Sequence, residues 1–187
     1  MQRWLPAVIF LLLICPMAEG GQHKIDMTYS LLLDKGGAAA VHDGLLSGQS
    51  FRLRLAARQD LFVYLVVENG EDDFRLLYPN ADIDRGKNQL NKKEAMVWPT
   101  RGWLRLDDNT GTDRMYLILS VMPITELETR FAMREQGFSE DLLLDIRDRY
   151  QDSGRYRRDL KGAETRVRFK SPDQPAVLVE EIALRHL

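Results

Sequence analysis

Residues 61–67, LFVYLVV, decide the fold. The run is apolar at all seven positions, is rich in β-branched and aromatic side chains, and lies between Asp60 and the turn residues 68–70 (ENG). A run of this length suits a β-strand better than a helix, and the lack of a polar position predicts burial of both faces. We therefore expect residues 61–67 to form a central strand of a sheet.

Further strands are predicted on both sides of this run. Residues 50–57 (SFRLRLAA) alternate between apolar residues and the arginines Arg52 and Arg54, which is typical of a strand with one solvated face. The other predicted strands are short and are separated by turn residues. They span residues 27–33, 74–78, 94–98, 102–106, 114–122, 165–169 and 176–184.

The pattern changes to helical spacing after residue 123. Leu127 and Phe131 recur on one helical face, and Thr125 followed by Glu128 has the form of a capping box. A second helix is expected to begin at residue 139, where acidic residues suit its first turn. The two helices predict a hairpin over about residues 124–150.

Together these patterns predict a mainly β (α+β) fold. The spacing of the strands indicates an antiparallel β-sandwich or partial barrel, with the helical hairpin inserted before the last strands. Residues 21–187 are expected to form this single domain. In the last strand, Glu180 and Glu181 interrupt the alternation, as a β-bulge would.

The first twenty residues have the plan of a secretory signal peptide. Arg3 is followed by the apolar run 7–15 (AVIFLLLIC), and the small residues Ala18 and Gly20 precede Gly21. Nine apolar residues are too few to cross a bilayer, so we expect residues 1–20 to be removed. A retained membrane anchor is the alternative.

The number and position of the cysteines indicate the cellular compartment of the protein. The one cysteine, Cys15, follows Ile14, whereas a lipoprotein signal has a small residue at that position, so lipidation is not expected. Removal of the signal leaves no cysteine for disulfides, thiolate metal sites or nucleophiles. An exported chain without disulfides fits a bacterial envelope, and we expect a periplasmic or extracellular location.

No motif predicts catalysis, a metal or a cofactor. The three histidines lack the paired spacing of a zinc site. Residues 80–86 have alternating oxygen side chains, but Arg85 occupies the sixth position, where an EF-hand loop requires glycine, so a solvated turn is preferred. The net charge of -2 predicts no overall field that recruits nucleic acid.

Two regions are candidates for contact with a partner. The first is the loop beyond the stretch FRLLYPN (residues 74–80), where Pro79 ends the strand. Its candidate residues are Tyr78, Asn80, Asp82, Asp84, Arg85 and Asn88.

The second region is the basic stretch 147–161, in which arginines alternate with tyrosines. Its candidate residues are Arg149, Arg155, Arg157 and Arg158. In an exported protein this composition favours an anionic lipid, a glycan or an acidic protein over nucleic acid. A solvated helix end and loop is the preferred interpretation of this stretch, because runs of charge are usually solvated.

The segment 48–123 resembles the bacterial domain of unknown function 4384 family. The likeness lies in the order GQSFRLRL, DLFVYLVV, LLYPN, KNQL, WP and RMYLILSVMP, although Asp60 and Leu61 stand where the family has Gly-Tyr. The signature positions are Leu77, Tyr78, Pro79, Asn80, Asn88 and Pro99. The resemblance implies a mostly β module, often exported or attached to other domains, and it supplies no catalytic residue.

These observations lead us to expect an exported, non-catalytic binding or assembly module. It would serve a bacterial envelope system, such as a secretion apparatus, a pilus or a surface structure, and its partner would be another envelope protein. Nucleic acid is not expected, and the membrane is involved only by proximity.

Two other functions remain open at this stage. One is a cell-wall hydrolase that uses carboxylates such as Asp82 and Asp84. The other is a sensor of a sugar or small ligand in which Trp98 and Trp103 form a stacking platform. Packing of the two indoles across a hairpin is the preferred interpretation of that pair.

Overall fold

The computed structural model describes residues 23–68, 73–107 and 111–185, without the side chains of His42, Ile83 and Asp84. The predicted signal peptide, residues 1–20, lies outside the described residues. The strands are β1 (Lys24–Leu33), β2 (Ala38–Ala39), β3 (Ser50–Ala57), β4 (Leu61–Glu68), β5 (Phe74–Tyr78), β6 (Gln89–Leu90), β7 (Ala95–Trp98), β8 (Leu104–Arg105), β9 (Thr112–Ser120), β10 (Gly137–Phe138), β11 (Arg155–Lys161), β12 (Glu164–Lys170) and β13 (Val177–Arg185). The helices are the 3₁₀ helix η1 (Val41–Asp43) and the α-helices α1 (Ala81–Asp84), α2 (Thr125–Met133) and α3 (Glu140–Tyr150).

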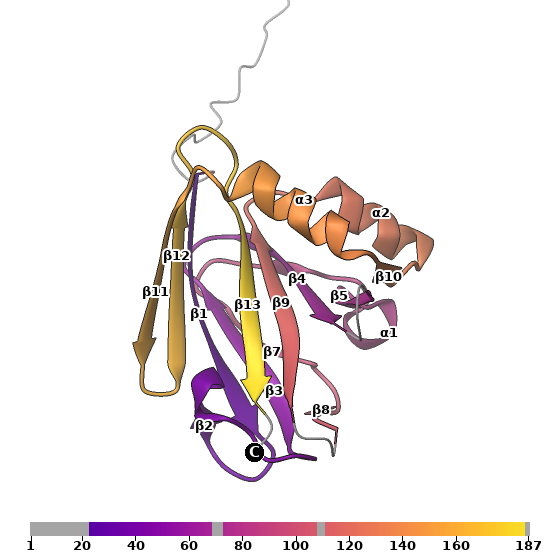
Figure 1. Ribbon diagram of the computed structural model, residues 1–187, viewed down its shortest axis with the longest axis vertical. Coiled ribbons are helices and arrows are strands. Elements are labelled where there is room, and N and C mark those ends of the chain that lie inside the picture. Colours follow the sequence, from indigo (N-terminus) through magenta and orange to yellow (C-terminus); the bar gives the residue numbers. More distant parts are fainter. Residues whose placement is uncertain (1–22, 69–72, 108–110, 186–187) are drawn as a thin grey trace, which may run out of the picture.

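The strands form two antiparallel sheets packed face to face. The β1 sheet has the order β11-β12-β1-β3-β7, with β2 on β1 and β8 on β3. The β4 sheet has the order β10-β5-β4-β9-β13, with β6 on β4. Helices α2 and α3 lie on the outer face of the β4 sheet, so the layers run β1 sheet, β4 sheet, helices (Figure 1). The predicted β-sandwich with an inserted helical hairpin is confirmed.

The central position of β4 explains its unbroken apolar sequence. β4 lies between β5 and β9. Leu61, Val63 and Leu65 belong to the core between the two sheets, whereas Tyr64 and Val66 belong to a second core beneath the helices. Both faces of the strand are therefore buried, as its sequence predicts.

The predicted capping box at the start of α2 is wrong. The N-cap residue is Ile124, and it makes no side-chain cap hydrogen bond, while Thr125 is already the first helical residue. Glu128 turns toward the β4 sheet, where its carboxylate accepts hydrogen bonds from Tyr64 and Asn88. Tertiary partners thus replace the local cap, because two fixed donors lie within reach of this carboxylate.

Two expectations for the last strands are also wrong. Residues 155–161 form strand β11 rather than part of a loop, since they pair along their whole length with β12. The pairing of β13 with β9 is regular, so Glu180 and Glu181 form no bulge. The irregularity lies instead between Leu65 and Val66 in the pairing of β4 with β5. In the part of the chain that the structure describes, no helix is long and apolar enough to cross a membrane.

Candidate functional site

The loop that follows β5 is anchored by two of the predicted contact residues. Tyr78 is 3 % exposed, donates its hydroxyl hydrogen to the carbonyl oxygen of Lys87, and meets Trp98 edge-on with ring centroids 5.8 Å apart. Asn88 is 7 % exposed, and its Nδ2 donates to Glu128 Oε1 over 2.8 Å. Both side chains hold the fold and are not available to a partner.

A buried polar network fixes the same loop to α2. The hydroxyl of Tyr64 donates to Glu128 Oε1 over 2.6 Å and accepts the backbone N–H of Ile124 over 2.9 Å. Burial, followed by the hydrogen bond to Glu128, raises the pKa of Tyr64 above its ordinary value. The network joins β4, the start of α2 and Asn88, and the signature positions Tyr78 and Asn88 are therefore architectural.

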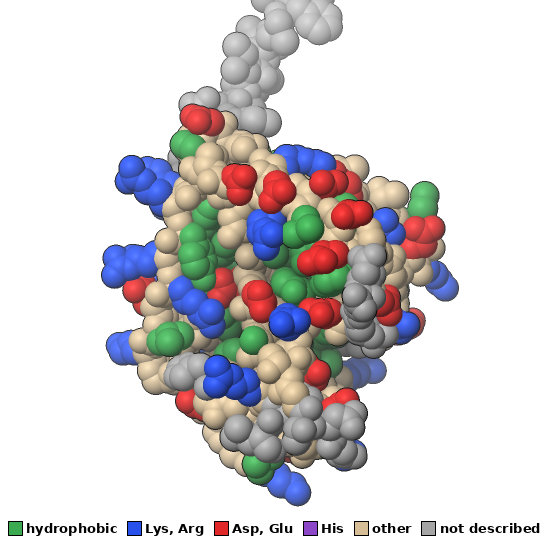
Figure 2. All heavy atoms as spheres, viewed as in Figure 1, with side chains coloured by type: hydrophobic (Ala, Val, Ile, Leu, Met, Phe, Trp, Pro, Cys, Tyr) green, Lys and Arg blue, Asp and Glu red, His purple; other side chains and the backbone are tan. Residues whose placement is uncertain are grey.

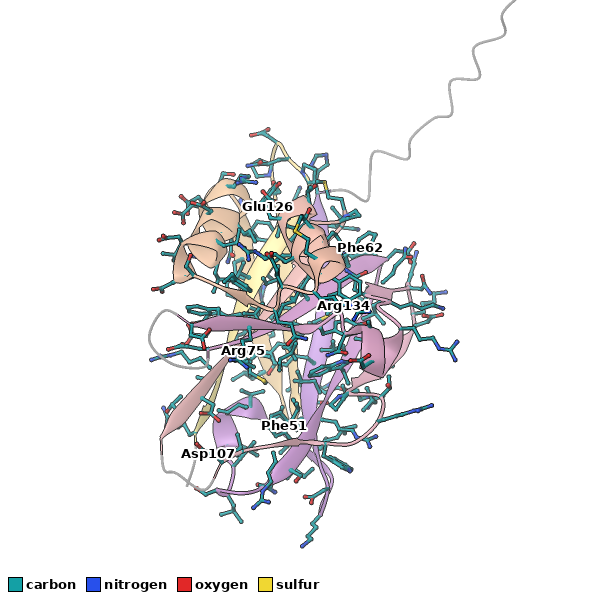
Figure 3. The ribbon with its side chains drawn as sticks, turned by 90° about the vertical axis from the view of Figure 1, so that its right-hand side faces the viewer. Phe51, Phe62, Arg75, Asp107, Glu126 and Arg134 are labelled. Atoms are coloured by element: carbon teal, nitrogen blue, oxygen red, sulfur yellow. The ribbon has the colours of Figure 1, made fainter. Side chains whose placement is uncertain are left out.

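The remaining residues of the loop lie beside a small cavity. Asn80 and Asp82 line it together with Arg130, Phe131 and Arg134 of the α2 end, and Figure 3 shows Arg134 at that end of the helix. The Oδ1 of Asn80 accepts the backbone N–H of Asp82 over 2.9 Å, which closes the turn after the strand. The cavity holds about 90 Å³, less than the clefts that bind small ligands. Asp82 and Arg85 are exposed, and the side chain of Asp84 lies outside the described residues.

Strand alternation divides the predicted basic stretch among three environments. Arg149 lies on α3 and pairs with Glu126 of α2. Arg155 and Arg157 project from one face of β11, whereas Arg158 projects from the other and reaches Glu180. The four arginines therefore form no common surface.

Arg155 and Arg157 instead belong to a larger surface, the outer face of the β1 sheet. Cross-strand partners along β1, β3, β11 and β12 place nine basic side chains on this face against three acidic ones, Asp26, Asp159 and Glu164. We call this surface the basic face. Its basic members are Lys24, Arg52, Arg54, Arg155, Arg157, Lys161, Arg166, Arg168 and Lys170.

Two aspartates organise the centre of the basic face. Asp26 accepts two hydrogen bonds from Arg166, over 2.8 and 2.6 Å, and this contact lowers the pKa of Asp26. Asp159 accepts from Arg168 and, over 3.0 Å, from Arg157 Nε. Six cations of the face have no carboxylate within ion-pair distance among the described residues: Lys24, Arg52, Arg54, Arg155, Lys161 and Lys170.

The opposite outer layer of the molecule is acidic. The helical hairpin, residues 124–150, carries seven acidic residues against the four arginines Arg130, Arg134, Arg147 and Arg149. One of the seven, Glu128, turns inward to the β4 sheet. The acidic residues are Glu126, Glu128, Glu135, Glu140, Asp141, Asp145 and Asp148. Figure 2 shows carboxylates gathered over α3, and Lys and Arg side chains along the left-hand margin where β11 and β12 lie in Figure 1. A chain of net charge -2 thus separates its charges onto two opposite layers.

A buried carboxylate lies between the two sheets, near their β11 and β13 edges. Glu180 is 3 % exposed and accepts hydrogen bonds from Tyr29 over 2.8 Å and from Tyr156 over 2.6 Å, and Arg158 Nε lies 3.4 Å away. The inward positions of β13 are every second residue, with Leu178 before Glu180 and Ile182 after it. Had we continued this alternation through the glutamate pair, the sequence would have indicated that Glu180 points inward.

The two tryptophans do not form a shared platform. Trp98 is 2 % exposed and belongs to the core between the sheets. Trp103 is 43 % exposed, and the guanidinium of Arg52 lies 4.3 Å from its ring centroid. The stacking arrangement considered for a sugar sensor is therefore absent from the described structure.

One comparison with known proteins identifies part of the chain. Residues 45–123 match the family model of a domain of unknown function (DUF4384). The resemblance predicted over residues 48–123 is confirmed. The matched segment contains β3 to β9 and ends before α2, so most of the basic face lies outside it. Searches among curated proteins and among solved structures found no match.

The buried tyrosines predict a loss of stability in alkali. Burial raises the pKa of the buried Tyr29 and Tyr64, and partial burial raises the pKa of the half-buried Tyr116 to about 12. A raised pKa in the folded state means that stability is intact below the unfolded value of about 10 and is lost as pH rises above it. We expect each buried tyrosine to contribute about 1.4 kcal/mol per pH unit to this fall.

Urea unfolding between about pH 8 and about pH 11 measures the effect. Tyr64→Phe removes one titrating group, so its free energy of unfolding should fall less steeply with pH than that of the wild type. Identical slopes for the two proteins would contradict the assignment.

Proposed function

We propose that this chain is an exported, non-catalytic binding module of a bacterial envelope, which docks through its basic face on an acidic surface of another envelope protein. The observation that carries the proposal is the collection of nine basic side chains against three acidic ones on one sheet face. The accessory system would be a secretion apparatus, a pilus or a surface structure. The basic face accordingly replaces most of the contact residues expected from the sequence.

Charge separation supports docking in one orientation. The basic face and the acidic helical layer lie on opposite sides of the sandwich. An acidic partner is therefore attracted to the basic face and repelled by the helical layer. Lys24, Arg54, Arg155 and Lys170 have no described carboxylate to neutralise them, which leaves their charge for a partner. The predicted signal peptide supports the proposal of an exported module.

The other two functions receive less support from the described geometry. Asp82 is exposed beside a cavity of about 90 Å³, and the described residues contain no cluster of three or more potential metal ligands. The buried Trp98 removes the two-indole platform on which the sensor hypothesis rested.

Charge reversal on the basic face tests the proposal. The triple variant Arg54→Glu, Arg155→Glu and Lys170→Glu leaves the Asp26 and Asp159 pairs intact. We expect it to recover a partner from envelope fractions at least about tenfold less well than the wild type, because each reversal replaces attraction by repulsion. Added salt should weaken the wild-type complex in the same direction.

The matched control changes the same net charge elsewhere. Arg134→Glu, Arg147→Glu and Arg185→Glu are exposed positions outside the basic face. Partner recovery should persist in this variant. Equal recovery by both triple variants, or binding that does not respond to salt, would show that the basic face is not the docking surface.

A further inference from the structure

The two sheets protect their edges unequally. At the β13 edge, the N–H of Val179 donates to Gln151 Oε1 over 3.0 Å, and the carbonyl oxygen of Arg185 accepts the N–H of Leu45 over 2.8 Å. At the β5 edge, β10 pairs with the strand and the N–H of Leu76 donates to the carbonyl oxygen of Gln136 over 2.8 Å. β7 is an edge of only four residues. Each of these edges is covered or short, as natural sheets require.

β11 is the exception. It is a seven-residue edge strand, it pairs with β12 on one side, and within the described ranges no backbone group bonds to its other side. Every second residue of an edge strand directs its N–H and C=O away from its neighbour, so β11 presents unpaired donors and acceptors. Figure 1 shows β11 at the outer left margin of the sandwich.

The inner face of β11 carries apolar surface that lacks cover. Tyr156 and Leu160 are 43 % and 54 % exposed, although the residues that they pair with on β12, Phe169 and Thr165, are buried. The β4 sheet ends at β13 and does not extend over β11. A further strand beside β11 would place its own inward side chains against Tyr156 and Leu160.

The charged side chains of β11 limit which kind of strand could pair with its open edge. A second copy of β11 would oppose its arginines with arginines, which is unfavourable for directly opposed residues. Arg155, Arg157 and Lys161 project from the outer face, where acidic side chains of an added strand would lie opposite them. The complementary strand therefore alternates acidic residues on the outer side with apolar residues on the inner side.

We infer that the outer edge of β11 binds an extended segment of the partner protein, with alternating acidic and apolar residues, as an additional strand of the β1 sheet. This inference rests on the proposed function, because β11 forms the open margin of the basic face. The partner's backbone supplies hydrogen bonds, its acidic side chains meet the basic face, and its apolar side chains cover Tyr156 and Leu160.

A synthetic peptide of eight alternating glutamate and valine residues is the probe. Two further versions carry N-methyl groups, one on all valines and the other on all glutamates, and a block peptide has the same composition without alternation. We expect the unmodified peptide to bind the full chain and the block peptide to bind at least about tenfold more weakly, because only alternation satisfies both faces. One N-methylated version should lose binding and the other retain it, because only alternate N–H groups face β11.

Leu160→Asp is the matching protein variant, with Leu46→Asp as its control. Both leucines are exposed, at 54 % and 63 %, so each substitution adds one negative charge without opening the core. Leu160→Asp should weaken binding of the unmodified peptide about tenfold or more, and Leu46→Asp should leave it within about twofold. Amide exchange at every second residue of β11 should slow when the peptide binds.

The outcomes separate this inference from the proposed function. In one outcome, the triple variant of the basic face loses partner recovery while both N-methylated peptides bind equally and Leu160→Asp has no effect. That combination of results would overturn strand addition and leave basic-face docking in place. Failure of the unmodified peptide to bind would also overturn strand addition. Unchanged partner recovery in the triple variant would overturn the proposed function itself.

Discussion

Replacement of Glu180 by alanine is expected to lower the free energy of unfolding by about 3 kcal/mol. The carboxylate is 3 % exposed and accepts hydrogen bonds from Tyr29 and Tyr156, with Arg158 Nε at 3.4 Å. Its removal leaves the buried hydroxyl of Tyr29 without this partner and opens a cavity between the sheets. A buried donor without an acceptor costs more than the hydrogen bond itself contributes.

Urea unfolding of Glu180→Ala measures this loss, and the neighbouring Glu181→Ala is the control. Glu181 lies on the opposite face of β13, is 53 % exposed at the side chain, and forms an exposed pair with Arg114 at 3.5 Å. Exposed ion pairs contribute less than about 1 kcal/mol, so Glu181→Ala should be close to the wild type. Similar stabilities of the two variants would show that Glu180 does not hold β11 to the rest of the sandwich.

Substitution of Gly154 by alanine is expected to destabilise the chain by about 3 kcal/mol. A Cβ atom at this position would lie 1.9 Å from Cε2 and 2.1 Å from Cζ of Phe169. Phe169 is 2 % exposed and belongs to the core between the sheets, so its ring has no free space into which to turn. Relief of the overlap requires the backbone before β11 to move.

Gly37→Ala is the matched control, because a Cβ atom there would meet nothing within 4 Å. We expect its free energy of unfolding to equal that of the wild type or to rise by up to about 1 kcal/mol. Gly154→Ala should also weaken binding of the alternating peptide, since it displaces the start of β11. Equal free energies of unfolding for the two variants would show that the close approach of Gly154 to Phe169 does not contribute to stability.

Sequence patterns predicted the elements whose periodicity is local. The alternation in residues 50–57 and the apolar run 61–67 correspond to β3 and β4, and the expected hairpin at 124–150 corresponds to α2 and α3. Each of these elements buries a face that its own side chains define. Their prediction needed no knowledge of which strand lies beside which.

Local patterns failed where a distant partner changed the role of a residue. Thr125 and Glu128 have the form of a capping box, but Tyr64 and Asn88 supply better-placed donors for the carboxylate. Charged residues 155–161 resemble a solvated loop, and only their pairing with β12 makes them a strand. Propensity is a weak guide when tertiary hydrogen bonds are available.

Local patterns were sufficient to predict the β class of the fold, the position of the helical hairpin and the resemblance of the middle segment to a known family. The collection of basic side chains on one sheet face depends on strand pairing, which appears in the tertiary structure alone. The pairings Lys24 with Lys170 and Arg157 with Arg168 bring basic residues from separate strands onto one face. The same packing buries Glu180 and exposes the edge of β11. The alternation within one strand determines which of its own residues share a face. Pairing between strands that are distant in sequence determines which strands contribute residues to that face, and local patterns do not contain this information.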